Sequence, residues 1–553
     1  MKNKARNFIK IISKIVFSRT LIVLLMILVQ IAFFPLTYRY LNSYVPGAIE
    51  VMSVLGGLLL VFIVNQDEPA EFKMTWAIII CITPVLGALI YLFIQLNWGM
   101  VDLKKKVANE HKLTDGMLYT SDSTRQSLLN EDEAFKGFAR YMDNVCGFPV
   151  YHNTTVKFFP IGEEKIEDLK KELLLAKDFI FMEYFIIDRG VVWDSILEIL
   201  KQKAKEGVEV RVMYDGLCSL MLLPYGYPKK LKEMGIEAKA FAPIVPFLST
   251  TQNNRDHRKI VVIDGKIAYT GGVNLADEYT NQKVVYGHWK DVAIKLEGRA
   301  VMSFTLMFLQ NWNLYGKEDI EYAKYVEKSV AIFEEHNKEH NRDFSKEHNR
   351  ESNNKLDVEA TKNTEIPLKN EKGFVIPYGD TPTLRKEIGK TVYEDMLSRA
   401  DKYIHIMTPY FIVDREFLAT LKFAAERGVD VKLILPHIPD KKYAFDIART
   451  FYPSLLSAGV RVYEYTPGFV HAKLAVTDDS AATIGSVNMD YRSFYHHFEC
   501  GSFIYKSPAV MDIEKDFQDT LSKCVEVDMD YYNNIPIFSR MCGRFLRMLA
   551  PLM

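Results

Sequence analysis

Two segments of the chain each place a histidine two residues before a lysine and seven residues before an aspartate. They read HRKIVVIDGKIAYTGGVN at 257–274 and HAKLAVTDDSAATIGSVN at 471–488, and the shared residues are His257, Lys259, Asp264, His471, Lys473 and Asp478. Residues i and i+2 of a strand project from the same face, so each imidazole is expected beside an ammonium group. One such pattern can arise by chance, but two with the same internal spacing indicate a duplicated functional site.

This pair of motifs suits the transfer of a phosphodiester group. A neutral imidazole can attack phosphorus, and a protonated imidazole on the other side can donate its proton to the departing alcohol. We assign the nucleophile to His257 and the acid to His471, and the reverse assignment stays open. Lys259 and Lys473 are expected to balance the charge of the phosphate oxygens, which describes a reaction with no metal ion and no other cofactor.

Polar residues near each motif are candidates to bind the substrate or to orient the histidines. Asn274, Ser486 and Asn488 lie in the small-residue turns and are expected to donate hydrogen bonds to the phosphate. Each imidazole also needs an acceptor for its second ring nitrogen. Asp291 and Glu499, each downstream of its own motif's asparagine, are the candidates.

Two features leave some roles open. Gly272 stands where the second motif has Ser486, so one donor is missing on the first side and the two histidines need not have interchangeable roles. Asp264 and Asp478 end apolar strands, so they either take part in the site or only fix the turn that follows.

The elements that must position the motifs are themselves repeated. FIFMEYFIIDRG at 179–190 resembles IHIMTPYFIVDRE at 404–416, and KAKEGVEVRVMYD at 203–215 resembles AAERGVDVKLILP at 424–436. Strand and helix patterns alternate, which predicts two α/β/α sandwich domains, at 108–333 and 373–553, related by a pseudo-twofold axis. The polar segment 334–372 between them predicts a disordered linker, whose histidines we do not expect to bind metal.

The overall composition limits the kinds of molecule that the protein is expected to bind. Lys and Arg number 69 against 70 Asp and Glu, a net charge of −1, which argues against a nucleic-acid partner. The six cysteines are scattered and suggest neither a zinc site nor a disulfide scaffold. A homo-oligomer is possible, although no particular residue points to one.

Residues 1–107 predict a membrane anchor with two or three hydrophobic segments, at Leu21–Tyr38, Val51–Val64 and Trp76–Leu96. Basic residues precede the first segment and follow the third, which favours cytoplasmic catalytic domains but leaves the number of crossings open. The C-terminal segment IPIFSRMCGRFLRMLAPLM reads either as an interfacial helix or as a helix docked on the catalytic core.

From about Val150 to the C-terminus the chain resembles the phospholipase D superfamily, whose signature is two H-x-K-x-x-x-x-D motifs, each followed by a Gly-x-x-Asn turn. Within it the chain is most similar to bacterial cardiolipin synthases, on the strength of Trp76, Pro84, Gly87, Tyr91 and Leu92, the TPYF strand at 408–411 and the Pro-Leu-Met end. The extra hydrophobic segment and the long linker depart from the family pattern.

That resemblance implies a multi-pass enzyme of the bacterial cell membrane. It would join two phosphatidylglycerol molecules into cardiolipin through a phosphohistidine, release glycerol and need no cofactor, with phosphatidylglycerol and membrane lipids as its partners. A membrane-bound phospholipase D-type hydrolase, with water as acceptor, is the alternative enzyme. A catalytically inactive lipid-binding scaffold is the alternative of another class.

Overall fold

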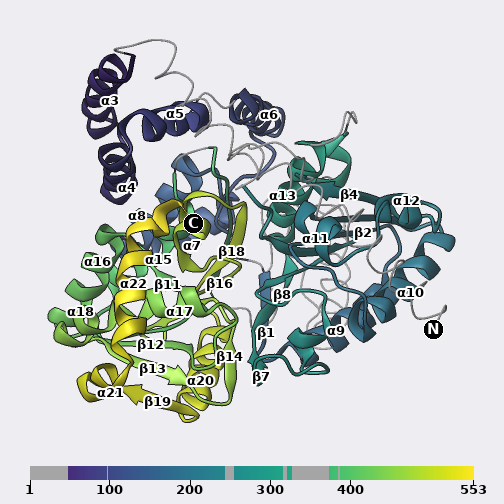
Figure 1. The fold of residues 1–553 in the computed structure, drawn as a ribbon. Helices are drawn as coiled ribbons and strands as arrows, with labels where there is room; N and C mark the ends of the chain where they lie inside the picture. Colours follow the sequence, from purple (N-terminus) through teal and green to yellow (C-terminus); the bar gives the residue numbers. More distant parts are fainter. Residues whose placement is uncertain are drawn as a thin grey trace, which may run out of the picture.

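The structure is a computed structural model that describes residues 48–95, 98–152, 154–242, 254–314, 320–326, 373–383 and 386–552. Two domains, each built on a mixed sheet with helices on its faces, lie side by side, and a group of N-terminal helices lies at one end (Figure 1). The first hydrophobic segment, the N-terminal basic cluster and the predicted linker lie outside the described residues.

The first domain is built on a seven-stranded sheet with the order β1-β8-β6-β5-β2-β3-β4. The strands are β1 (Thr154–Phe159), β2 (Phe179–Tyr184), β3 (Glu209–Asp215), β4 (Glu237–Phe241), β5 (Lys259–Ile263), β6 (Ile267–Gly271) and β8 (Ala293–Gly298). The central strands β2 and β5 are buried along their whole length because both faces of the sheet are covered: along β2, Phe179 and Phe181 enter one core, and Ile180 and Met182 enter another. Helices α9 (Gly162–Leu175) and α10 (Val191–Lys205) cover one face, and α13 (Val301–Leu314) covers the other.

The second domain repeats this sheet with one added strand, in the order β19-β13-β12-β10-β15-β16-β18-β9. Its strands are β9 (Phe374–Asp380), β10 (Tyr403–Met407), β12 (Asp430–Pro436), β13 (Arg461–Tyr465), β15 (Leu474–Thr477), β16 (Ala481–Gly485), β18 (Glu499–Tyr505) and β19 (Cys524–Val527). Read from β9, the order matches that of the first sheet strand for strand, which confirms two α/β domains of one type. Helices α15 (Ile388–Arg399), α16 (Arg415–Glu426) and α20 (Ala509–Leu521) pack on it.

The domains meet through reciprocal contacts, the pattern that a pseudo-twofold axis generates. Strand β7 (His288–Lys290) pairs in parallel with β14 (Gly468–Val470), and β6 contacts both β16 and β18. Helix α13 reaches β9, and α20 reaches β1. The motif strands β5 and β15 are central in their own sheets. Both begin at the interface with the other domain.

Further elements lie in and beside the two domains. They are α6 (Trp98–Leu113), α7 (Asp122–Leu129), α8 (Glu133–Arg140), η1 (Tyr141–Val145), α11 (Gly216–Met221), α12 (Tyr227–Lys232), η3 (Asp277–Thr280), β11 (Phe411–Ile412), α17 (Lys442–Arg449), α18 (Tyr452–Ser457), β17 (Met489–Asp490), α19 (Tyr491–Tyr495), α21 (Met529–Asn534) and η4 (Ala550–Leu552).

The third predicted hydrophobic segment is divided between two helices. Within the segment that starts at Trp76, which is long enough to span a bilayer, the structure describes α4 (Ala70–Ile82) and α5 (Pro84–Gln95). Helix α4 ends at Ile82 because Thr83 precedes a proline, and a residue in that position disfavours helical backbone. The two helices pack closely: a Cβ on Gly87 would lie 2.9 Å from the backbone of Ile80.

The preceding helix, α3 (Ala48–Val64), covers the second hydrophobic segment with 17 residues and packs on α5. It exposes a row of large apolar side chains, namely Val51, Val54, Leu55, Leu58, Val61, Phe62 and Val64. Within the described ranges, no helix combines the length and the apolar character needed to cross a membrane.

The C-terminal helix α22 (Ile537–Leu549) is docked along one face and open along the other. It packs on α17 so closely that a Cβ on Gly543 would lie 2.3 Å from the carbonyl oxygen of Asp446. It also accepts a hydrogen bond from Thr75 Oγ1 of α4 at Met548 O, over 2.9 Å. Its other face exposes Ile537, Phe538, Met541 and Phe545. The prediction of a helix docked on the catalytic core therefore describes one face of α22. The other face presents an exposed apolar stripe.

Candidate active site

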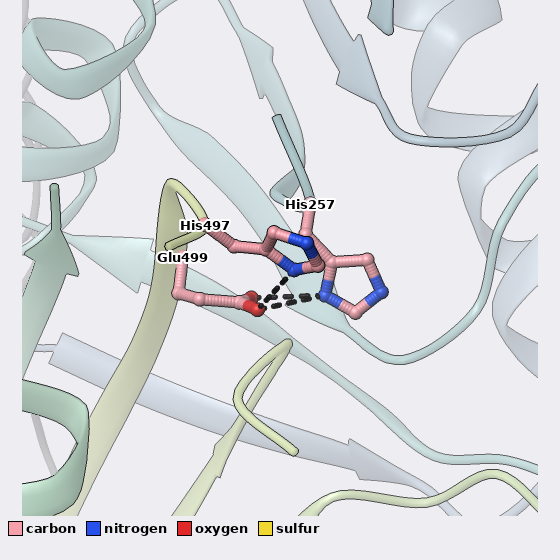
Figure 2. A group of neighbouring side chains, drawn as sticks. All are labelled: His257, His497 and Glu499. Atoms are coloured by element: carbon pink, nitrogen blue, oxygen red, sulfur yellow. Dashed lines mark hydrogen bonds and ion pairs between the residues drawn. The ribbon is translucent and has the colours of Figure 1, made fainter. Parts of the chain in front are cut away.

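His257 is held by the second domain. It lies just before β5, and its backbone N–H donates to Phe498 O over 2.9 Å. Its Nδ1 lies 2.9 Å from Oε1 and 3.0 Å from Oε2 of Glu499, the first residue of β18 (Figure 2). An Nδ1–H donated to the carboxylate places the ring's free electron pair on Nε2, the atom that can attack phosphorus.

His471 is held by the first domain in the same manner. Its backbone N–H donates to Lys290 O over 2.7 Å, and its Nδ1 lies 2.6 Å from Oδ2 of Asp291. Both acids that the sequence singled out therefore contact an imidazole, but each serves the histidine of the other domain. No described residue makes a hydrogen bond to Nε2 of either motif histidine, which leaves both atoms for a substrate.

The two motif lysines lie inside the same buried site. Lys259 Nζ donates to His257 O over 2.5 Å, and Lys473 Nζ donates to His471 O. Burial lowers the pKa of Lys259 to about 8 and that of Lys473 to about 7, although the carboxylates oppose the shift. Both Glu499 and Asp291 act on each lysine, so the charges of the two motifs form one electrostatic unit across the interface.

The two histidine–carboxylate pairs differ in how they hold protons. Burial lowers the pKa of both imidazoles well below the usual range. Burial also acts to raise the pKa of Glu499, but the hydrogen bonds that its carboxylate accepts from His257 outweigh it and keep this carboxyl ionised. Burial raises the pKa of Asp291 to about 7. The His471–Asp291 pair, whose members are 2.6 Å apart, therefore holds an additional proton near neutral pH.

Gly272 and Ser486 occupy equivalent positions in the two motifs, and each suits the acid that lies beside it. Ser486 Oγ donates to Glu499 Oε2 and accepts from Cys500 N over 3.0 Å, so its hydroxyl holds the carboxylate that holds His257. A Cβ on Gly272 would lie 2.0 Å from Asp291 Oδ1. Glycine thus leaves the space that Asp291 needs to reach His471.

The motif asparagines lie near the site with their amides turned to different partners. Asn274 accepts from Ile186 N over 3.1 Å and donates to Tyr279 Oη over 2.8 Å, so both ends of its side chain are used within its own domain. Asn488 is buried, and its Oδ1 has no hydrogen-bond partner among the described residues. Asn488 therefore keeps its side-chain oxygen available to a ligand.

Asp264 and Asp478 lie at the far ends of the motif strands. Asp264 accepts from the backbone N–H groups of residues 177, 178 and 179, and Asp478 from those of residues 401, 402 and 403. Both have positive φ angles, 53° and 52°. Each fixes a turn and the start of the neighbouring strand β2 or β10, which supports the structural interpretation of these aspartates.

Replacing Asp478 by alanine is expected to destabilise the fold more than it impairs chemistry. The change leaves three backbone N–H groups without their acceptor and puts alanine in a left-handed conformation, at a cost of about 2–4 kcal/mol. Thermal unfolding should show a clearly lowered Tm, while the single-turnover rate per folded molecule stays within about threefold of wild type. Asp478→Asn, which keeps an acceptor and tolerates positive φ, is the matched control. A large loss of rate at unchanged Tm would instead place Asp478 in the chemistry.

Sequence reasoning missed several residues of the site. Ser493 Oγ donates to Glu499 Oε1 over 2.7 Å. His497 lies beside Glu499 and His257, with its ring centroid 5.4 Å from that of His257 (Figure 2). The sequence could have indicated His497, because it precedes Glu499 by two residues, and residues two apart in an extended chain share a face. Aromatic rings complete the walls: Phe185 packs on His257, and Tyr279, Trp289 and Phe469 pack on His471.

Comparison with known proteins identifies the family. Residues 169–287 and 393–521 match the family described as cardiolipin synthase, PLD-like domain, and residues 54–95 match the phospholipase D-nuclease N-terminal family. A cardiolipin synthase of Halalkalibacterium halodurans is 32% identical, covering 96% of this chain and 99% of that protein. An uncharacterized protein of Streptococcus mutans serotype c is 43% identical, covering 90% of this chain and 100% of that protein.

One solved structure shares the fold. Phosphatidylserine synthase from Haemophilus influenzae Rd KW20 superposes with a TM-score of 0.53 at 16% identity, covering 75% of this chain and 98% of that one. At this identity the likeness shows a shared fold. The paired motifs, the family matches and the near full-length relatives establish that the chain belongs to the phospholipase D superfamily, with two cardiolipin synthase-like domains.

Proposed function

We propose that this protein is a cardiolipin synthase, which transfers a phosphatidyl group from one phosphatidylglycerol to another and releases glycerol through a phosphohistidine. The observation that carries the proposal is the crossed pairing of His257 with Glu499 and of His471 with Asp291 in one buried site. Relatives named cardiolipin synthase, at about a third identity over nearly the whole chain, support the choice of substrate.

In the first step His257 is the nucleophile. Its ring is neutral because burial lowers its pKa, and ionised Glu499 fixes the tautomer with the electron pair on Nε2. A bond forms between Nε2 and phosphorus while the bond from phosphorus to the glycerol oxygen breaks. His471, which with Asp291 holds a proton near neutral pH, donates it to that oxygen. The imidazolium that forms at His257 is stabilised by Glu499.

The second step reverses these roles with a new alcohol. The glycerol hydroxyl of a second phosphatidylglycerol gives its proton to His471, which is now neutral, and its oxygen attacks phosphorus. The bond between phosphorus and Nε2 of His257 breaks, and cardiolipin leaves. Lys259 and Lys473 balance the phosphate charge in both steps. The departing glycerol and the entering alcohol use the same acid–base group, which suits transfer between like alcohols.

Exposed apolar surfaces support a location at the bacterial cell membrane. The row on α3 and the stripe on α22 present large apolar side chains, and the Thr75–Met548 hydrogen bond ties the N-terminal helices to the C-terminal one. Lys104, Lys105 and Lys106 follow on α6, which favours catalytic domains on the cytoplasmic side. Lipid headgroups would then supply both the donor and the acceptor.

The test uses purified full-length protein in mixed micelles with phosphatidylglycerol labelled in its headgroup glycerol. Free glycerol, cardiolipin and phosphatidic acid are followed together. Glycerol released in step with cardiolipin supports the synthase. Glycerol with phosphatidic acid would identify a hydrolase, and folded protein that forms no product would identify a scaffold.

The rate constant kcat/KM is expected to fall as the pH rises above about 7. Loss of the proton shared by His471 and Asp291 removes the acid, and neutralisation of Lys473 and Lys259, with pKa values of about 7 and about 8, removes positive charge that the phosphate needs. All three groups are active when protonated, so the changes act in one direction, and the slope of log(kcat/KM) should exceed one per pH unit. Initial rates at subsaturating substrate test this, and a rate that stays constant up to about pH 9 would contradict it.

A further inference from the structure

A third imidazole lies in the site without a hydrogen-bond partner among the described residues. The side chain of His497 is 8% exposed, and neither of its ring nitrogens makes a hydrogen bond among the described residues. Its Nδ1 lies 3.6 Å from Glu499 Oε1, which is an ion-pair contact and too long for a hydrogen bond (Figure 2). A buried polar group left unbonded costs free energy, so the arrangement calls for a ligand at His497.

The neighbours of His497 are those of a transition-metal site. One ligand atom from each of His257, His497 and Glu499 can be chosen so that all three lie within 4.8 Å of one another. Two imidazoles and a carboxylate form a donor set that Zn²⁺ uses in proteins, and ligands of one tetrahedral ion lie about 3.4 Å apart. Two of the distances here, 2.9 Å from His257 Nδ1 to Glu499 and 3.6 Å from His497 Nδ1 to Glu499, lie on either side of that value.

The groups behind Glu499 favour metal binding as well. Ser486 and Ser493 both donate hydrogen bonds to its carboxylate, so the oxygen atoms are held in place from behind. Hydrogen bonds of this kind orient the ligands of protein metal sites. Within the described residues, no other group of three histidine, cysteine or acidic side chains comes together in this way.

We propose that His257, His497 and Glu499 bind a divalent transition-metal ion of the zinc type, and that this ion switches the enzyme off. The proposal rests on the function proposed above, in which Nε2 of neutral His257 attacks phosphorus. A metal ion at Nδ1 takes the electron pair of that nitrogen, and the proton that Nδ1 carried moves to Nε2. The pair on Nε2 is then no longer available, and Glu499 is drawn from the imidazole to the ion.

Direct binding is the first measurement. Chelator-treated full-length protein in detergent micelles is titrated with Co²⁺, followed by its absorption bands, and with Zn²⁺ by calorimetry. Wild type should bind one ion per chain, and His497→Gln should weaken binding by about 100-fold. His496→Gln is the matched control, because the ring of His496 packs against Phe72, 5.7 Å away, and it should bind as wild type does. X-ray absorption at the zinc edge of wild type should show two imidazoles, and this result does not depend on any variant folding.

Inhibition is the second measurement, with each protein compared with its own metal-free rate. Zn²⁺ should inhibit wild type and His496→Gln, a chelator should restore both, and His497→Gln should resist. Metal binding that does not depend on His497, or binding without inhibition in an active enzyme, would overturn the proposal. If wild type binds the ion through His497 but makes no cardiolipin, the metal site stands and the proposed function fails.

Discussion

Alanine at His257 or at His471 should each lower cardiolipin formation by at least about 10⁴-fold, but for different reasons. Without His257 no bond to phosphorus can form, because its Nε2 is the attacking atom. Without His471 the attack remains possible, but the departing glycerol oxygen receives no proton. With a substrate whose leaving group needs no proton, the two variants should therefore differ in their first step.

A substrate with a nitrophenol in place of glycerol makes that difference measurable, because nitrophenolate leaves as a stable anion. His471→Ala should release about one equivalent of nitrophenolate per chain and then stop, since the acceptor alcohol lacks its base. The phosphatidyl group should remain on His257, where peptide mapping by mass spectrometry can find it. His257→Ala should release none.

The control and the opposing outcomes are equally specific. His405→Ala removes another buried imidazole with a carboxylate partner, since His405 Nδ1 lies 2.9 Å from Glu514, and it should keep the wild-type pattern. A burst from His257→Ala and none from His471→Ala would reverse the assignment of nucleophile and acid. No burst from either variant would exclude the covalent route.

Adding a single methyl group at Gly272 should lower activity by about 10³-fold. The Cβ of Gly272→Ala would lie 2.0 Å from Asp291 Oδ1, so the carboxylate must leave its place beside His471. His471 then loses its orientation and the partner with which it holds the proton near neutral pH. Gly272 has no side chain that could contact a substrate, and the added methyl group would meet Asp291, so the expected effect acts through Asp291.

Three comparisons isolate that cause. Gly137→Ala in α8 places its Cβ where nothing lies within 4 Å and should have no effect. The nitrophenol substrate should restore the first step in Gly272→Ala, as it does in His471→Ala. Adding Asp291→Ala to Gly272→Ala should cost little more, because the acid is already displaced. Activity of Gly272→Ala within about threefold of wild type would show that the site adapts to the added atom.

Much of the fold could be read from sequence because its signals are local and repeated. The β2 and β10 strands and the turns after β5 and β15 each follow from a short pattern, and the duplication fixed both domains at once. The break inside the third hydrophobic segment is local too: hydropathy averaged over a window does not register the interruption that Thr83–Pro84 imposes.

The chemistry of the site was also readable, since a repeated histidine, lysine and aspartate at one spacing allow few functions. Asp291 and Glu499 could be named as candidate partners because each imidazole needs an acceptor for its second ring nitrogen. Which histidine each acid serves could not be named. Distance along the chain says nothing about which strand ends face each other when two domains pack, and here the packing crosses the pairs.

The same limit explains the remaining differences. Ser486 and Asn274 were expected on the phosphate, but in the folded protein Glu499, Ile186 and Tyr279 take their hydrogen bonds. His497 gained a place in the site only because β18 reaches the interface. Residue types decide which reactions are possible, and the residue types can be read from the sequence. Burial and apposition decide the pKa values, the tautomers and the partners, and these exist only once the two domains have closed on each other.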